Sequence, residues 1–193
     1  MRRFFNVTLA LGSALLLWTA SAQAASFEMT PAIQALLEQQ KTLVTAWAAD
    51  PALVQGVQAQ NAKGPLAGMD NARWKTLRRT EADIKAFQSN PAGQWLKHKL
   101  DASGGVFNEA FVNAAQGEKV AFVEKTSSYI HKGQPKFDVP FSTGKAWQGT
   151  AEFDESSQTY AIQIAVPVLA DSKPIGVLVV GVNLSHLEKN AKP

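Results

Sequence analysis

Lys125 and Tyr129 offer the clearest binding chemistry in this sequence of 193 residues. They lie four positions apart in a stretch, residues 120–129, that we predict to be a β-strand, so both side chains would point to one face of a sheet. A lysine ammonium can pair with a carboxylate, and a tyrosine hydroxyl can both donate and accept a hydrogen bond. The alternatives are a solvated Lys125 and a half-buried Tyr129 whose hydroxyl meets water.

Trp74 and Arg78 form a second candidate pair, on a helix that we predict over residues 71–88. A spacing of four places both side chains on one side of that helix. Together they would offer a stacking surface and a bidentate clamp for a carboxylate. The alternative is that Trp74 belongs to the core while Arg78 extends outward into water.

Residue patterns typical of catalysis and metal binding are absent from the sequence. It contains no cysteine, which excludes disulfides and thiolate chemistry, and no G-x-S-x-G motif. The three histidines, His98, His131 and His186, have no partner at metal-ligand spacing. We therefore expect no enzyme, no cofactor and no metal site, although sequence alone leaves a serine or paired-carboxylate hydrolase open.

The first 24 residues have the three parts of a secretory signal peptide. Arg2 and Arg3 precede an apolar run over residues 7–18, and Ala22-Gln23-Ala24 is a cleavage signal of small residues. The alternative, an uncleaved membrane anchor, requires an apolar run of about 20 residues. We expect cleavage after Ala24 and export to the periplasm, with no stable membrane insertion afterwards.

The charge of the mature chain gives no sign of a nucleic-acid partner, and we expect none. The leader holds two of the 19 basic residues and none of the 16 acidic ones, so the chain without its leader is close to neutral. The basic pI of the whole sequence is therefore no sign of a nucleic-acid partner.

The mature chain, residues 25–193, is predicted to be one domain with a helical part (30–102) followed by a sheet part (104–185). A capping side chain followed by proline, at Thr30-Pro31, Asp50-Pro51 and Asn90-Pro91, marks three helix starts. After Ser103-Gly104-Gly105 the apolar period shortens to two. Helices followed by about five antiparallel strands predict the α+β class.

The final hairpin, residues 160–184, is the strongest strand signal. Its first strand repeats apolar residues at every second position, and Asp171-Ser172-Lys173 supplies the turn. The members that share one face are Ile162, Ile164, Val166 and Val168. Before the hairpin, residues 131–149 are predicted to be a long irregular connection, of a kind that is often functional.

Several of these segments together resemble an extracytoplasmic PAS-like sensor domain of the Cache (PDC) family. The resemblance extends over about residues 30–184 and is best in the sheet part. It rests on KTSSY at 125–129, a loop with Gly133, Phe137, Phe141, Gly144 and Trp147, and the hairpin pairs Pro167-Val168, Ile175-Gly176 and Gly181-Val182. It implies N-terminal helices packed on one face of a five-stranded antiparallel sheet, with a small-molecule pocket on the other face.

The resemblance implies a sensing or binding domain, here expected to have no attached signalling output, for a small molecule such as a small carboxylate. Phe137 and Trp147 would close the pocket and Asp138 would accept from an amine, while a core position for Trp147 is the alternative. The full set of expected ligand-binding residues is Tyr129, Lys125, Trp147, Asp138, Phe137, Trp74 and Arg78. The alternative function is a protein-interaction module that docks on a membrane sensor or transporter, with its pocket filled by its own side chains.

Overall fold

The computed structural model describes residues 27–154 and 158–191. The expected signal peptide and its cleavage site lie outside the described residues. Within the described ranges, none of the helices combines the length and the apolar character that crossing a membrane requires.

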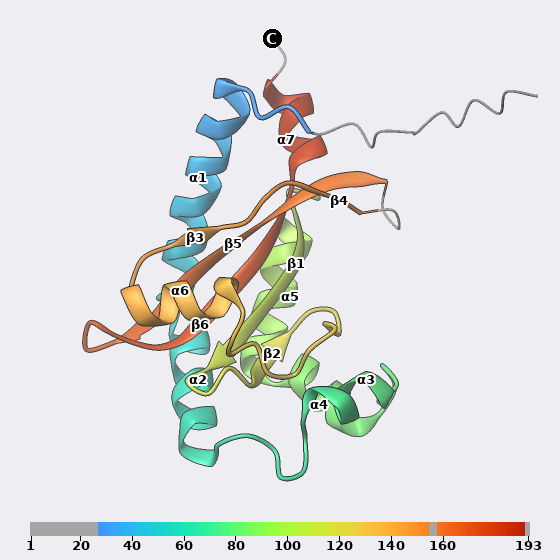
Figure 1. Cartoon of the computed structure of the whole chain (residues 1–193), viewed down its shortest axis with the longest axis vertical. Coiled ribbons are helices and arrows are strands. Elements are labelled where there is room, and N and C mark those ends of the chain that lie inside the picture. Colours follow the sequence, from blue (N-terminus) through green and yellow to red (C-terminus); the bar gives the residue numbers. More distant parts are fainter. Residues whose placement is uncertain (1–26, 155–157, 192–193) are drawn as a thin grey trace, which may run out of the picture.

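A six-stranded antiparallel sheet forms the middle layer (Figure 1). The strand order is β2-β1-β6-β5-β3, and β4 also pairs with β5. The strands are β1 (Phe107–Ala114), β2 (Lys119–Phe122), β3 (Trp147–Gln148), β4 (Glu152–Asp154), β5 (Thr159–Ala170) and β6 (Lys173–Asn183). The helices are α1 (Pro31–Ala48), α2 (Pro51–Lys63), α3 (Asn71–Thr76), α4 (Ala82–Ser89), α5 (Pro91–Ala102), α6 (Pro135–Thr143) and α7 (Leu184–Ala191). The predicted α+β class is confirmed.

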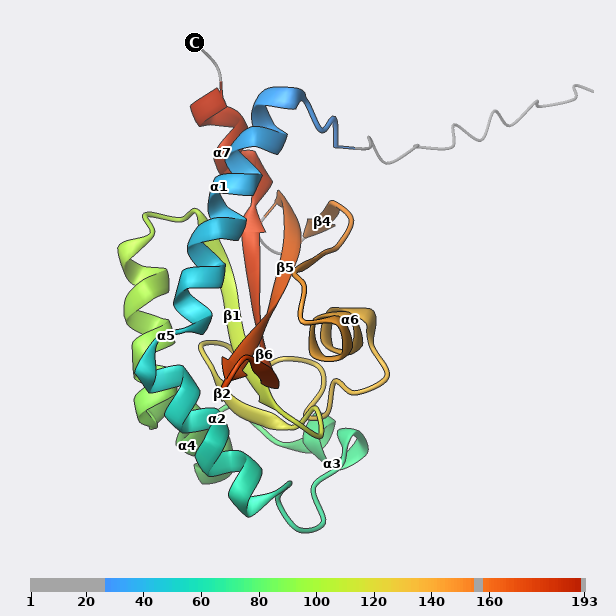
Figure 2. The same ribbon diagram turned by 90° about the vertical axis from the view of Figure 1, so that its left-hand side faces the viewer.

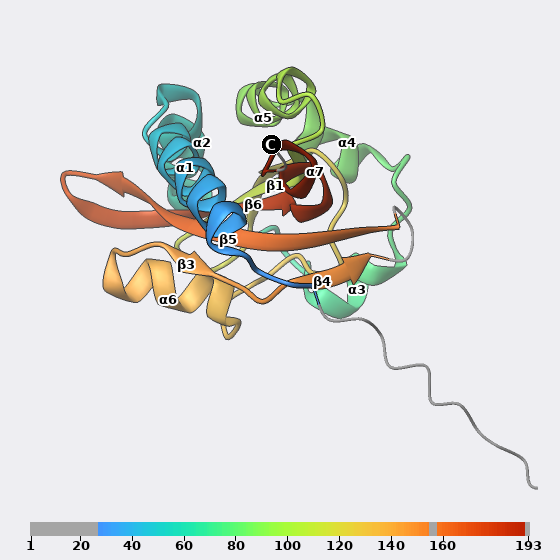
Figure 3. The ribbon, with the colours of Figure 1, turned by 90° about the horizontal axis from the view of Figure 1, so that it is seen from above.

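Helices α1, α2 and α5 cover one face of the sheet, whereas α6 lies on the other side (Figures 2 and 3). The helix-covered face carries the larger core. Ile162, Ile164, Val166 and Val168 all point into it, as their spacing predicted, and pack with residues of α1, α2 and α5. The opposite face is therefore the one on which loops and α6 can form a site.

The three predicted helix starts are confirmed by their caps. Thr30 Oγ1 accepts from the Ile33 amide at 3.3 Å, Asp50 Oδ1 from Ala52 at 2.9 Å, and Asn90 Oδ1 from Gly93 at 2.8 Å. Each cap is followed by proline at the first helical position, where its missing N–H leaves no hydrogen bond unmade.

The final hairpin forms with the predicted turn. Asp171 and Ser172 have φ angles of 48° and 61°, the left-handed conformations of a two-residue turn that matches the twist of paired strands. The turn joins β5 to β6 in antiparallel register, with Ala170 opposite Lys173.

Two predicted elements are shorter in the structure than we expected. The helix over residues 71–88 is two helices, because Leu77 is extended at ψ 136° and Glu81 Oε1 accepts from the Arg78 amide at 2.7 Å. Trp74 and Arg78 therefore do not share one helix. The strand over residues 120–129 ends at Phe122, so Lys125 and Tyr129 lie on a loop and share no strand face.

Two helices were not predicted. The connection over residues 131–149 contains α6 and β3, and α6 starts at Pro135 by the same proline rule that marked the first three helices. Helix α7 follows directly on β6 and buries Leu184 and Leu187 in the helix-side core. Its eight residues give a short pattern that the sequence does not distinguish from a tail.

Candidate functional site

The sheet face opposite α1, α2 and α5 is divided into a packed part and an open part. The packed part is a cluster that we call the aromatic core: Trp74, Phe87, Phe111, Phe122, Tyr129 and Phe137, with Met69, Ile84, Ala165, Val177 and Val179. Its side chains come from α3, α4, α6, the sheet, the connection before α3 and the loop after β2. They fill the place where the sequence led us to expect a pocket.

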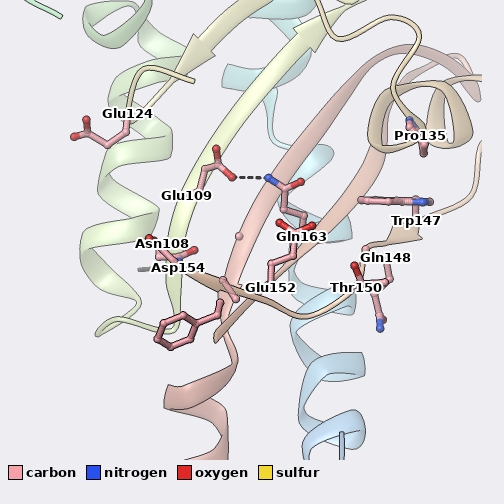
Figure 4. A pocket seen from close by; sticks show the side chains of 14 residues that line it. Asn108, Glu109, Glu124, Pro135, Trp147, Gln148, Thr150, Glu152, Asp154 and Gln163 are labelled. Atoms are coloured by element: carbon pink, nitrogen blue, oxygen red, sulfur yellow. Dashed lines mark hydrogen bonds between the residues drawn. The ribbon is translucent and has the colours of Figure 1, made fainter. Parts of the chain in front are cut away.

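The open part is a groove of about 860 Å³ beside the aromatic core (Figure 4). Glu109 and Gln163 lie on its floor, and Gln163 Nε2 donates to Glu109 Oε2 at 2.7 Å. The oxygen of the Gln163 amide accepts from Lys136 Nζ of α6 at 2.9 Å. The groove is lined by Asn108, Glu109, Glu124, Pro135, Trp147, Gln148, Gly149, Thr150, Glu152, Phe153, Asp154, Ala161, Gln163 and Gly181.

Four carboxylates therefore line the open groove, from β1, the loop after β2, and β4. Glu109 is half-buried and held by Gln163, whereas Glu124 is exposed and lies 3.4 Å from Arg79. This lining suits an amine, amide or hydroxyl group of a ligand and repels an anionic one.

A lysine that the sequence did not single out lies inside the protein, on the same sheet face as the groove. The side chain of Lys119 is fully buried, and its Nζ lies 3.2 Å from the ring centroid of Phe111. Nζ has no hydrogen-bond partner among the described residues. Burial holds the pKa of the Lys119 ammonium well below its usual range, against the opposing pull of the Glu109 carboxylate.

The surroundings of Lys119 are polar on one side. Asn113 is its cross-strand partner on β1. Asn113 Oδ1 and Glu118 Oε1 are, with Lys119 Nζ, the three buried side-chain atoms that have no partner among the described residues. His131 stacks on Phe111, with ring centroids 4.8 Å apart, and its Nδ1 lies 3.4 Å from Asn113 Nδ2. Burial, more than the charges of Lys119 and Lys136, lowers the pKa of His131 to about 2, so this imidazole is neutral at pH 7.

Lys119 and Asn113 thus place an unpaired donor and an unpaired acceptor on one buried patch of the sheet. Unpaired buried polar atoms are rare in folded proteins and call for an explanation, of which a ligand is one. The sequence did not predict this buried patch, because Glu118 and Lys119 follow the Gln116-Gly117 turn, and charged residues beside a turn are normally solvated.

Four of the seven expected ligand-binding residues lie on the same sheet face, three of them in the aromatic core. Tyr129, Trp74 and Phe137 are buried there. The Tyr129 hydroxyl accepts from the Leu66 amide at 2.9 Å, and burial raises the pKa of that hydroxyl. Trp147 lines the open groove.

The other three expected residues lie away from the groove lining. Lys125 is half-buried with its Nζ 5.0 Å from the Trp74 ring centroid, and burial, with the charge of Arg79, lowers its pKa. Asp138 is exposed and accepts from the Gly133 amide at 3.0 Å, which fixes the start of α6. Arg78 is exposed on the connection between α3 and α4.

Asn71 holds the loop between β2 and α6 in place. Its Oδ1 accepts from the amides of Tyr129 and Ile130, each at 2.8 Å, and its Nδ2 donates to the Ile130 carbonyl at 3.0 Å. Asn71→Ala should lower the free energy of unfolding by about 2 kcal/mol, because partly buried backbone groups lose their partners. Urea unfolding measures this; Ser127→Ala, on the exposed part of the same loop, should change it by less than about 0.5 kcal/mol. Equal effects of the two substitutions would contradict this role.

No protein-family model and no curated protein matches this chain. Several solved structures do match this chain. The sensor domain of E. coli DcuS aligns with a TM-score of 0.50 at 14% identity, over 81% of this chain and 96% of that one. The V. cholerae histidine kinase DctB sensor domain gives 0.43 at 17% identity, over 83% and 60%, and the C. jejuni chemoreceptor Tlp3 sensory domain gives 0.45 at 14%, over 81% and 58%.

The chain spans about 60% of the DctB and Tlp3 domains and nearly all of the DcuS domain. At these identities the similarity concerns the fold. The fold is that of the DcuS sensor domain, which confirms the PAS-like Cache fold implied by the resemblance of residues 125–129, the following loop and the final hairpin.

Proposed function

We propose that residues 25–193 form a periplasmic sensor-type domain that binds a small molecule bearing a carboxylate. The observation that carries this proposal is the buried, unpartnered Nζ of Lys119 on the sheet face opposite the helices. An ammonium in such a position is unfavourable alone and becomes favourable when a carboxylate pairs with it. The fold is consistent with a sensing role, because DcuS, which has a similar fold, is a sensor domain.

Asn113 and the groove further limit the chemical class of the ligand. The free Oδ1 of Asn113 requires a donor, which a hydroxyl or amino group next to the carboxylate would supply. Glu109 and the other groove carboxylates disfavour a second negative charge on that side. The expected ligand is a small acid with one carboxylate at Lys119 and a hydroxyl or amino group beside it.

A ligand screen tests the proposal. Acetate, propionate, lactate, succinate and malate are compared by thermal shift and calorimetry, and lactate should bind more tightly than propionate, because only lactate offers a donor to Asn113. A ligand at 100 times its Kd should stabilise the fold by about 2.7 kcal/mol.

Two matched variants make the screen specific. Lys119→Met should abolish the response, whereas Lys97→Met should leave it unchanged, because Lys97 lies on α5 across the sheet and pairs there with Asp101. If no acid shifts the melting temperature, or if Lys119→Met still responds in full, the carboxylate proposal is wrong.

The runner-up is a protein-interaction module that docks on a membrane sensor or transporter. The aromatic core favours it, because Phe111, Phe122 and Tyr129 already fill much of the face where a ligand would lie. If the domain is such a module, cross-linking in periplasmic extracts should capture a partner protein. Its melting temperature should stay unchanged with every acid of the screen.

A further inference from the structure

Lys119 has no hydrogen-bond partner, among the described residues, that would hold its proton in the free protein. Its Nζ lies against the face of Phe111, it is shielded from water, and it donates to no described residue. A ring face attracts a cation weakly compared with the hydration that burial removes. The free amine is therefore the favoured form of this side chain when no anion is bound.

The charged and titratable groups around Lys119 do not reverse that preference. From β1, Glu109 favours the ammonium, but its carboxylate is already engaged by Gln163. From α6, Lys136 opposes the ammonium. From the loop between β2 and α6, His131 is neutral. The Glu109 carboxylate and Lys136 act in opposite directions, so burial remains the dominant effect on the pKa of Lys119.

A bound carboxylate would favour the ammonium form of Lys119 over the free amine. It would bring a full negative charge and a hydrogen-bond acceptor into contact with Nζ, in a place where water does not screen the pair. We propose that a carboxylate binds at Lys119 together with one proton, so that the domain takes up the anion and the proton as a unit. This inference rests on the carboxylate-binding function proposed above and adds the way in which pH regulates it.

The coupling fixes the direction of the pH dependence. At a pH where free Lys119 is an amine and bound Lys119 is an ammonium, each binding event consumes one proton. The Kd should then rise about tenfold for each unit of pH increase. An acid bound through a lysine that is always charged would show no such slope near neutral pH.

Two measurements test the coupling separately from the function. The first uses the ¹³Cε and ¹Hε resonances of Lys119, identified by their absence in Lys119→Met, and requires no ligand. They should show a neutral amine at pH 7 in the free protein and an ammonium with saturating lactate or malate. The second is calorimetry with lactate and malate at pH 7.5 in phosphate and in Tris, whose ionisation heats differ. It should give an uptake of about one proton, and Lys97→Met should give the same value.

The outcomes separate the two proposals. A charged Lys119 in the free protein, or binding with the same heat in both buffers, overturns the coupling and leaves carboxylate binding standing. A neutral Lys119 that no acid of the screen converts to the ammonium overturns both. Proton uptake that persists in Lys119→Met assigns the proton to another group and overturns the coupling.

Discussion

Lys119→Met is expected to stabilise the protein while it abolishes carboxylate binding. Methionine has a similar length and can pack on Phe111 without bringing a polar head into the core. Removing an unpaired buried amine should raise the free energy of unfolding by about 1–3 kcal/mol. For a chain of this size that corresponds to a rise of several degrees in melting temperature, at roughly 2–4 °C per kcal/mol.

The stabilisation should depend on pH in a defined direction. Burial lowers the pKa of Lys119 in the folded state below the ordinary value of 10.5, so the unfolded chain binds more protons between those two values. The stability of the wild-type protein should therefore rise with pH in that window, by up to about 1.4 kcal/mol per unit. The Lys119→Met protein should lack this pH-dependent contribution. The amount by which its free energy of unfolding exceeds that of the wild type should therefore shrink as the pH rises.

Urea unfolding at pH 7, 8 and 9 measures both effects, with Lys97→Met as the charge-matched control. Lys97 is exposed and its removal should change stability by less than about 1 kcal/mol at every pH. A Lys119→Met protein that is less stable than the wild type would show that the lysine has a stabilising partner, and the proposed anion site would lose its basis.

Trp74→Ala should cause the largest loss of stability of any change discussed. Trp74 is fully buried, and its ring centroid lies 5.4 Å from that of Tyr129, 5.7 Å from Phe122 and 5.9 Å from Phe87. Its Nε1 also donates to the Thr126 carbonyl at 2.7 Å. Removing this ring should lower the free energy of unfolding by about 3–5 kcal/mol, as measured by urea unfolding.

Trp147→Ala is the matched comparison, because Trp147 is half-buried and lines the open groove. It should cost less than half as much stability, since part of its ring already meets water. If the Trp74→Ala protein kept its stability and lost only ligand binding, Trp74 would be a ligand platform, as its sequence spacing with Arg78 suggested, rather than a core residue.

The fold was largely predictable because its signals are local. The caps at Thr30, Asp50 and Asn90 need only two or three neighbouring residues to form. The alternation through Ile162 to Val168 reports which face of β5 is buried, and it assigned that face correctly. Both patterns are read within one element, so no knowledge of distant contacts was needed.

The site was less predictable because distant contacts decide it. Residues 123–129 look like a strand by alternation, but Asn71 and Trp74 bind the backbone of Tyr129 and Thr126 and hold the segment as a loop. Tyr129 then enters the aromatic core instead of a strand face. Lys119 was missed for the same reason, since its burial against Phe111, on which His131 stacks, depends on contacts between distant segments.

A crystal structure of the protein with the tightest-binding acid of the screen would test the central claim most directly. It should place a carboxylate oxygen about 2.8 Å from Lys119 Nζ and a hydroxyl or amino group of the ligand within hydrogen-bond reach of Asn113 Oδ1. An acid that instead lies wholly in the open groove, with Lys119 still buried against Phe111 and unpaired, would contradict it.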